Sequence, residues 1–164
     1  MSSLSVTVTE YWYPYFSWKS SAYSNPFTTM NPVPSAAVVF GSGPAWAAAL
    51  EGALFLKEVA MVPTEGCETR EGGTTAMFAL GEGQLVLSLA TRDDALLEEA
   101  ERTCASRGAT VLRLPGGDVA DRRLAPITAL PAITAIAASL ALTAGRDPDH
   151  PSWEAAYYQT ARRP

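Results

Sequence analysis

The stretch "GPAWAAALEGALFLKEVA", residues Gly43–Ala60, sets the pattern around which the rest of the chain is organised. It is rich in alanine and predicts a helix that is apolar over most of its surface. Glu51 and Glu58 stand seven residues apart within it, and this spacing places both carboxylates on one face of the helix. A buried carboxylate is costly unless it has a hydrogen-bonding partner, a raised pKa or a wet pocket, so these acids need an explanation.

Short apolar strands alternate with helices on both sides of this stretch. The strands are expected in "AAVVFGSG", "QLVLSLA" and "ATVLRLP", and the other helices over residues 91–108, 124–145 and about 152–162. The intervening "MVPTEGCETREGGTTAMFAL", residues 61–80, predicts an irregular loop and then a short helix. Strands that alternate with helices and are buried on both faces predict a three-layer α/β/α fold, with a parallel sheet of four to five strands.

Composition and charge narrow the class of protein. Of the 164 residues, 48% are apolar and 18% charged, which is typical of a folded domain. The net charge of −5 and the scattered Lys and Arg residues argue against nucleic acid and membrane partners. Cys67 and Cys104 lack metal-ligand spacing and form no disulfide framework, so no metal and a cytoplasmic location are expected.

Two segments bear on location in the cell. The N-terminus has no basic segment followed by an apolar run, so we expect no signal peptide. Residues 124–145 carry no charge over about the length that a bilayer requires. Their richness in Ala and Thr, together with two prolines, favours a buried core helix instead.

The first 35 residues differ from the rest in composition. They contain eight of the aromatic residues of the chain and only two charged ones, Glu10 and Lys19. So much aromatic surface requires a partner, so we expect residues 1–35 to be an extension that packs on the domain or on a second subunit. Residues 36–164 are expected to form the single domain.

The order and sequence of these segments resemble the sugar isomerase (SIS) domain family, and most closely the second SIS lobe of glucosamine-6-phosphate synthases. The glycine loop followed by "ALEGALFLKE" carries the resemblance, and a G-x-D-x-D-x-P ending at Pro151 supports it. It covers about residues 36–156. The resemblance implies a flavodoxin-like fold that binds a phosphorylated sugar or amino sugar, usually as a dimer and with no cofactor.

The resemblance also implies roles for particular residues. Glu58 matches the carboxylate that moves a proton between C1 and C2 of the sugar, and a carboxylate suits that task. Whether Glu58 has this role or a structural one is left open, and a structural role is favoured for Glu51. The expected ligand-binding residues are the glycine loop, which opens a helix N-terminus that can meet an anion, and four residues of the next loop. They are Gly41, Ser42, Gly43, Glu65, Glu71, Thr74 and Thr75.

Three departures from the family pattern weaken the case for catalysis. The catalytic histidine of the family falls at about Thr74 and its lysine at about Ala156, and neither side chain can replace those groups in proton transfer. In the loop after "LVLSLA", Asp93 and Asp94 would repel a phosphate. The segment "GGDVADRR" is short, so the fourth strand of the family is expected to be missing or vestigial.

Two functions therefore stand side by side. The first is an aldose–ketose (amino)sugar phosphate isomerase or a deglycase-like enzyme, with Glu58 as its base. The second is a non-catalytic SIS module, either a sugar-phosphate sensor or the second-lobe subunit of a split two-lobe enzyme. The expected protein partner is a second copy of the chain or a separately encoded first lobe.

Overall fold

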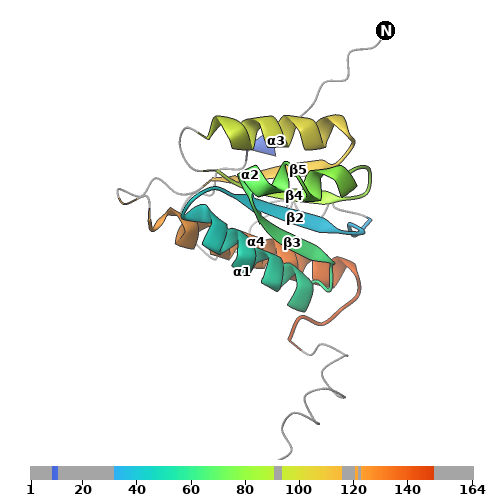
Figure 1. Cartoon of the computed structure of the whole chain (residues 1–164). Helices are drawn as coiled ribbons and strands as arrows, with labels where there is room; N and C mark the ends of the chain where they lie inside the picture. The colour runs from blue at the N-terminus through green and yellow to red at the C-terminus, as the bar shows by residue number, and fades with distance from the viewer. Residues whose placement is uncertain (1–8, 11–31, 91–93, 116–120, 122, 150–164) are drawn as a thin grey trace, which may run out of the picture.

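A parallel sheet forms the centre of the molecule (Figure 1). The computed structural model describes residues 9–10, 32–90, 94–115, 121 and 123–149. The five strands lie in the order β1-β5-β4-β2-β3, and every neighbouring pair is parallel. They are β1 (Thr9–Glu10), β2 (Ala37–Gly41), β3 (Thr64–Glu68), β4 (Leu85–Ala90) and β5 (Thr110–Pro115). The expected three-layer fold with a parallel sheet is confirmed.

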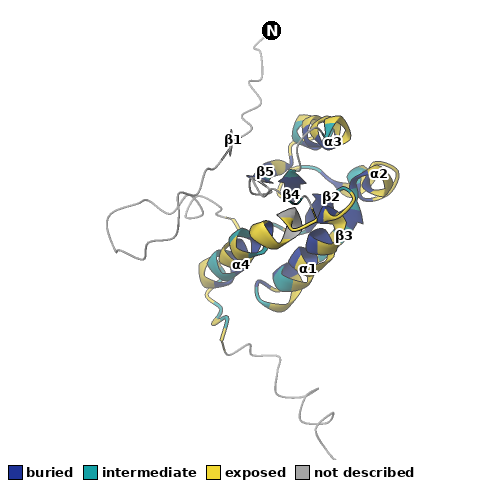
Figure 2. Ribbon diagram, turned by 90° about the vertical axis from the view of Figure 1, so that its left-hand side faces the viewer, coloured by how far each residue is buried: buried dark blue, intermediate teal, exposed yellow. Residues whose placement is uncertain are grey.

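Helices cover both faces of the sheet (Figure 2). One face is covered by α1 (Ala45–Glu58) and α4 (Ala125–Thr143). The other is covered by α2 (Thr69–Gly72), a 3-10 turn (Ala76–Ala79) and α3 (Ala95–Ser106). Successive strand residues point to opposite faces, so Val39 and Leu87 pack under α1 and α4, whereas Val38 and Val86 pack under α3.

The segment 61–80 was predicted as a loop followed by a short helix, and this prediction missed strand β3. The "TEGCE" strand is polar and lies at the sheet edge, where it pairs with β2 alone, so it lacks the apolar run of a central strand. Gly66 brings it close to α1, because a Cβ at Gly66 would lie 2.6 Å from the carbonyl oxygen of Ala49.

The helix ends follow the sequence signals only in part. The sequence favours Thr91 as the cap of α3, because threonine commonly occupies this position, but Thr91 lies outside the described residues. The carboxylate of Asp94 caps the helix by accepting a 3.0 Å hydrogen bond from the amide of Leu97. Gly108 ends this helix with a φ of +91°. The helix predicted over about 152–162 also lies outside the described residues. Within the described part, α4 is a helix of the outer layer, and no helix there is long and apolar enough to cross a membrane.

A buried polar network fixes α3 to the sheet. Ser88 of β4 and Glu101 of α3 are 0% and 3% exposed, and the Ser88 hydroxyl donates a hydrogen bond to the Glu101 carboxylate. Arg113 of β5 donates from Nε to the same carboxylate at 3.1 Å, and its other arm reaches Glu98 at 3.4 Å. The buried charge of Glu101 is therefore both paired and hydrogen-bonded.

Removing the cation of this network should be far more destabilising than removing an exposed one. We expect Arg113→Met to lower the free energy of unfolding by about 3 kcal/mol, because it leaves the Glu101 carboxylate buried without a counter-charge. The matched control is Arg102→Met on α3, whose 2.6 Å pair with Glu99 is exposed and should contribute at most about 1 kcal/mol. Urea denaturation measures both, and equal losses would contradict the role of the network.

The turn from β2 into α1 should require glycine at position 41. A Cβ at Gly41 would lie 2.4 Å from the carbonyl oxygen of Ala45, which is backbone and cannot rotate away. We expect Gly41→Ala to lower the free energy of unfolding by about 1–3 kcal/mol. Gly81→Ala is the control, because the nearest atom to its new Cβ is 3.5 Å away. If urea denaturation gave the same midpoint for both variants, the close approach would not constrain the turn.

Candidate functional site

The chain changes direction across the sheet at strand β2. It passes from β2 to β3 on one side, and then returns to place β4 on the other side of β2. The carboxyl ends of β2 and β4 thus flank the topological switch point, where open parallel sheets bind their ligands. The loop Ser42–Pro44 follows β2 at this point and leads into α1.

Two hydroxyl groups meet beside this loop. The Ser42 hydroxyl donates a 2.8 Å hydrogen bond to Oγ1 of Thr69, which is buried at the start of α2 after strand β3. Gly43 is exposed and has a φ of +54°, a conformation that side chains disfavour. Thr69 is a residue that the sequence did not single out, because its position depends on the pairing of the unrecognised strand β3 with β2.

Helix α1 supplies no acidic side chain and no side-chain cap at its own N-terminus. Pro44 at the cap position makes no side-chain capping bond, and the first turn contains no acidic residue. The positive end of the helix dipole therefore lies open beside Ser42 and Gly43. Such an end can receive an anionic group of a ligand.

The corresponding end of α3 is closed. The Asp94 carboxylate occupies it through its bond to Leu97, as the acidic residues in the sequence predicted; Asp93 lies outside the described residues. A second anion there would meet a like charge. Of these two helix ends at the switch point, α1 is the one suited to an anion.

The other predicted ligand residues lie along β3 and just after it. Glu65 on β3 and Glu71 on α2 are exposed. Both add to the effect of burial, which is the main cause that raises the pKa of the Cys67 thiol to about 11. The hydroxyls of Thr74 and Thr75 both donate to the carbonyl oxygen of Glu71, at 2.9 and 3.1 Å. These two hydroxyls thus satisfy the carbonyl of Glu71, and both residues are exposed to solvent.

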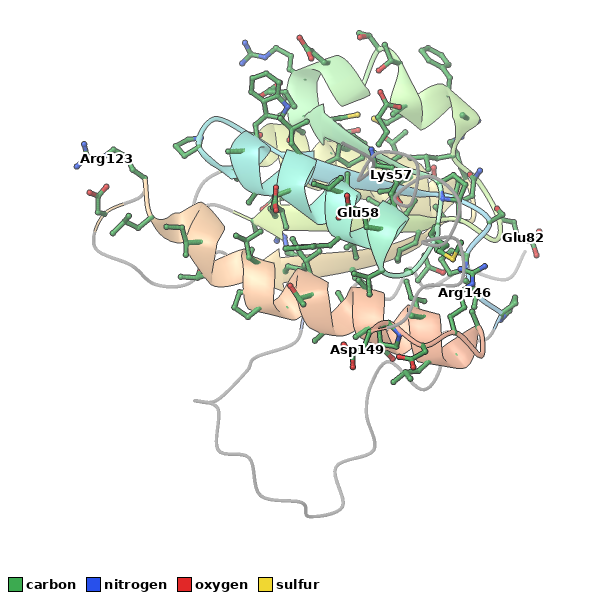
Figure 3. All side chains as sticks on the ribbon, turned by 90° about the horizontal axis from the view of Figure 1, so that it is seen from below. Lys57, Glu58, Glu82, Arg123, Arg146 and Asp149 are labelled. Carbon is green, nitrogen blue, oxygen red and sulfur yellow. The ribbon has the colours of Figure 1, made fainter. Side chains whose placement is uncertain are left out.

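Glu58 lies far from the Ser42 loop. It is the last residue of α1, and a helix of this length separates its ends by roughly 20 Å. In Figure 3, Arg123, which precedes α4, lies at one edge of the view, whereas Lys57 and Glu58 lie well away from it, nearer the middle. The structure therefore does not bring the predicted catalytic residue together with the predicted glycine loop.

The carboxylates of α1 are not buried. The argument from the cost of burying a carboxylate therefore does not apply to them. Glu51 and Glu58 are both exposed. The helix turns a different side toward the sheet and α4, and that side consists of small and aliphatic residues. They are Ala45, Ala48, Ala49, Gly52, Ala53 and Leu56. Glu51 faces outward, so the structural role favoured for it, binding neighbouring backbone or a partner helix, stays a prediction.

A shallow pocket opens at the carboxyl end of α1. It has a volume of about 310 Å³ and is lined by Lys57, Met61, Val62 and Pro63. Met61 has a φ of +54°, which is strained for a side chain of this kind. Within the described residues, no group of three or more His, Cys, Asp or Glu side chains is placed to hold a metal ion.

Comparison with known proteins agrees with the fold. No protein-family model and no curated protein matches the chain. Among solved structures, glucosamine-6-phosphate deaminase from Thermotoga maritima is similar, with a TM-score of 0.66 and 22% identity over 77% of this chain and 41% of that one. The C-terminal domain of glucosamine-fructose-6-phosphate aminotransferase from Francisella tularensis has a TM-score of 0.59 and 19% identity over 71% and 38% of the two chains.

A third match is a shorter protein. It is a candidate sugar-phosphate isomerase from Listeria monocytogenes, and it has a TM-score of 0.57 and 12% identity over 72% of this chain and 74% of that one. By contrast, the match to this chain spans only about two-fifths of the length of the first two proteins. At these identities the likeness concerns the fold, and the fold expected from the SIS resemblance is confirmed.

Proposed function

We propose that this protein is a phosphosugar-binding module that works as one lobe of a two-lobe assembly. The observation that carries the proposal is the separation of the predicted site into two parts, one at each end of α1. A hexose phosphate is much shorter than this helix. One ligand bound to one chain therefore cannot reach both the Ser42 loop and Glu58.

The Ser42 end supports binding of the phosphate group. It combines the open N-terminus of α1 with the Ser42 and Thr69 hydroxyls at the switch point of the sheet. The exposed carboxylate of Glu71, on the helix that Thr69 begins, can accept hydrogen bonds from sugar hydroxyls or an amine. Buried free thiols at Cys67 and Cys104 fit a reducing, cytoplasmic environment.

The outer side of α1, which ends at Glu58, supports contact with a second lobe. On the outer side of α1, Trp46, Leu50 and Leu54 are 43%, 49% and 39% exposed. Their spacing of four residues makes them one apolar stripe, and the same spacing leads on to Glu58. A stripe of this kind favours a covering partner, either a second copy or a separately encoded first lobe. The two longer solved structures have chain length available for such a lobe.

The enzymatic alternative uses the same arrangement across two subunits. Glu58 of one lobe would face a sugar whose phosphate is held by the other lobe. A carboxylate placed in this way can take a proton from the carbon beside a carbonyl and return it to the neighbouring carbon. Isomerisation is thus expected of the completed assembly and not of the isolated chain.

Thermal unfolding with added ligand tests the binding proposal. Glucosamine 6-phosphate should raise the Tm with concentration, because it binds the native state, whereas glucosamine should not. Ser42→Asp should abolish the shift, since the new carboxylate occupies the open end of α1. Glu58→Gln, and Thr134→Asp as an equally charged change on exposed α4 surface, should preserve it. If Ser42→Asp kept the full shift, the phosphate would not bind at this loop.

An activity assay separates the two functions. The isolated chain should not interconvert fructose 6-phosphate and glucose 6-phosphate, because Glu58 has no ligand-holding loop within reach. Turnover by the chain alone that Glu58→Gln abolishes would instead establish the enzyme, with a second copy completing the site. Light scattering on the same sample gives the number of copies present.

A further inference from the structure

Arg70 is the one arginine of the described structure whose guanidinium has no partner. It is exposed on α2, and only its backbone amide is engaged, in a 2.7 Å hydrogen bond to the Glu68 carboxylate. Every other described arginine is held by a carboxylate or a backbone carbonyl; these are Arg102, Arg107, Arg113, Arg123 and Arg146. The fold does not use the charge of Arg70, so it is available to an anionic ligand.

Arg70 directly follows the hydroxyl pair of the candidate site. Two hydroxyl groups have two protons, and the 2.8 Å hydrogen bond between Ser42 and Thr69 uses one of them. The other proton has no acceptor among the described residues, although Thr69 is only 1% exposed. A buried hydroxyl that lacks an acceptor indicates a bond that a ligand oxygen completes.

The packing of α1 on β3 brings Trp46 to the same corner of the sheet. The two elements cross at Gly66, where an added Cβ would lie 2.8 Å from the Cα of Leu50. From this crossing, α1 leads back to its first residues at the carboxyl edge, and β3 leads on to its last. One helical turn reaches Trp46 and two strand residues reach Glu68, and each step covers about 6 Å. Trp46 is therefore level with the end of β3, where α2 begins.

The indole of Trp46 is suited to contact a ligand at this corner. It is 43% exposed. Helical side chains lean toward the N-terminus of their helix, so the indole leans toward the loop that contains Ser42. Trp46 approaches the hydroxyl pair from the face of α1, and Arg70 approaches it from the face of α2. A large aromatic surface on one side and a cation on the other match a ligand with an apolar ring face and an anionic group.

We propose that Arg70 and Trp46 complete the ligand site at the Ser42 loop, with Arg70 paired to the phosphate and Trp46 packed against the sugar ring. This inference rests on the proposed function, and it defines the ligand as a sugar phosphate held in its closed-ring form. Two parallel N–H groups of the guanidinium match two phosphate oxygens. The remaining hydroxyl proton of the Ser42–Thr69 pair takes a third oxygen.

Calorimetric titration with glucosamine 6-phosphate tests the role of Arg70. Arg70→Met should raise the Kd at least about tenfold, because it removes charge-assisted hydrogen bonds to the phosphate. Arg70→Lys should fall between the two, since a lysine keeps the charge but not the planar pair of donors. The matched control is Lys57→Met, which removes an exposed cation at the other end of α1 and should leave the Kd unchanged. Equal effects of Arg70→Met and Lys57→Met would overturn the role of Arg70.

Tryptophan fluorescence tests the contact of Trp46 with the ring. The other tryptophans of the chain are Trp12, Trp18 and Trp153, so the signal of Trp46 is obtained by difference from Trp46→Phe. Glucosamine 6-phosphate should change the emission of the wild-type protein but not that of Trp46→Phe, which keeps an aromatic surface and should still bind. An unchanged wild-type emission at saturating ligand would overturn the contact.

A second pair of variants separates ring contact from contact with another lobe. Trp46→Ala should weaken binding of glucosamine 6-phosphate severalfold but leave binding of inorganic phosphate unchanged, because inorganic phosphate has no ring. Leu54→Ala, in the same stripe of α1 and 39% exposed, should bind both ligands as the wild type does. If Leu54→Ala weakened binding as much as Trp46→Ala, the stripe would act through a second lobe, and the proposed ring contact would be wrong.

The outcomes also distinguish this inference from the proposed function. If glucosamine 6-phosphate did not bind the wild-type protein, both would fall. If it bound, and Ser42→Asp abolished binding while Arg70→Met and Trp46→Ala kept full affinity, the Ser42 site would stand and only this inference would be overturned. Circular dichroism checks that each variant is folded.

Discussion

The contact of α1 with its surroundings is the constraint on which the rest of the structure depends. Helix α1 contacts β2, β3 and α4, and each of these contacts includes a glycine that has no room for a side chain. A Cβ at Gly66 would come within 2.6 Å of α1 backbone, and one at Gly52 within 2.8 Å of the Ile133 side chain. Close packing with few voids is the normal state of protein interiors, so a helix held this near fixes the positions of both neighbours. The position of α1 in turn fixes the Ser42 loop at its amino end and Glu58 at its carboxyl end.

The sequence predicted the fold well where apolar residues carry the signal. Strands β2 and β4 are runs buried on both faces and β5 is mostly apolar, and such runs are recognisable without a structure. Strand β3 was not recognised, because "TEGCE" is polar and obtains its place by pairing with β2 along one edge. The two-residue strand β1 carries no sequence signal at all. Pairing partners are long-range properties, and single-sequence patterns do not contain them.

The site was predicted less well, for a physical reason. Residue spacing along a helix gives the face on which a side chain lies, but not whether that face is buried. Glu51 and Glu58 do share one side of α1, yet that side faces outward. The acidic start of α3 was foreseen because it is a local feature, although the cap is Asp94 where Thr91 was expected. The Ser42–Thr69 hydrogen bond joins residues 27 positions apart and could not be foreseen.

Strand β1 has a consequence for association between molecules. A parallel sheet has two outer strands whose free amides and carbonyls can pair with another chain, and natural proteins protect them. Here β3 carries acidic side chains at Glu65 and Glu68, which repel a second copy of the same strand. The apolar strand β5 has no such charges beyond Arg113 and is covered by β1 instead. Strand β1 thus occupies the edge of β5 at Leu112 and Arg113, and a chain shortened past Glu10 would expose that edge to pairing with other molecules.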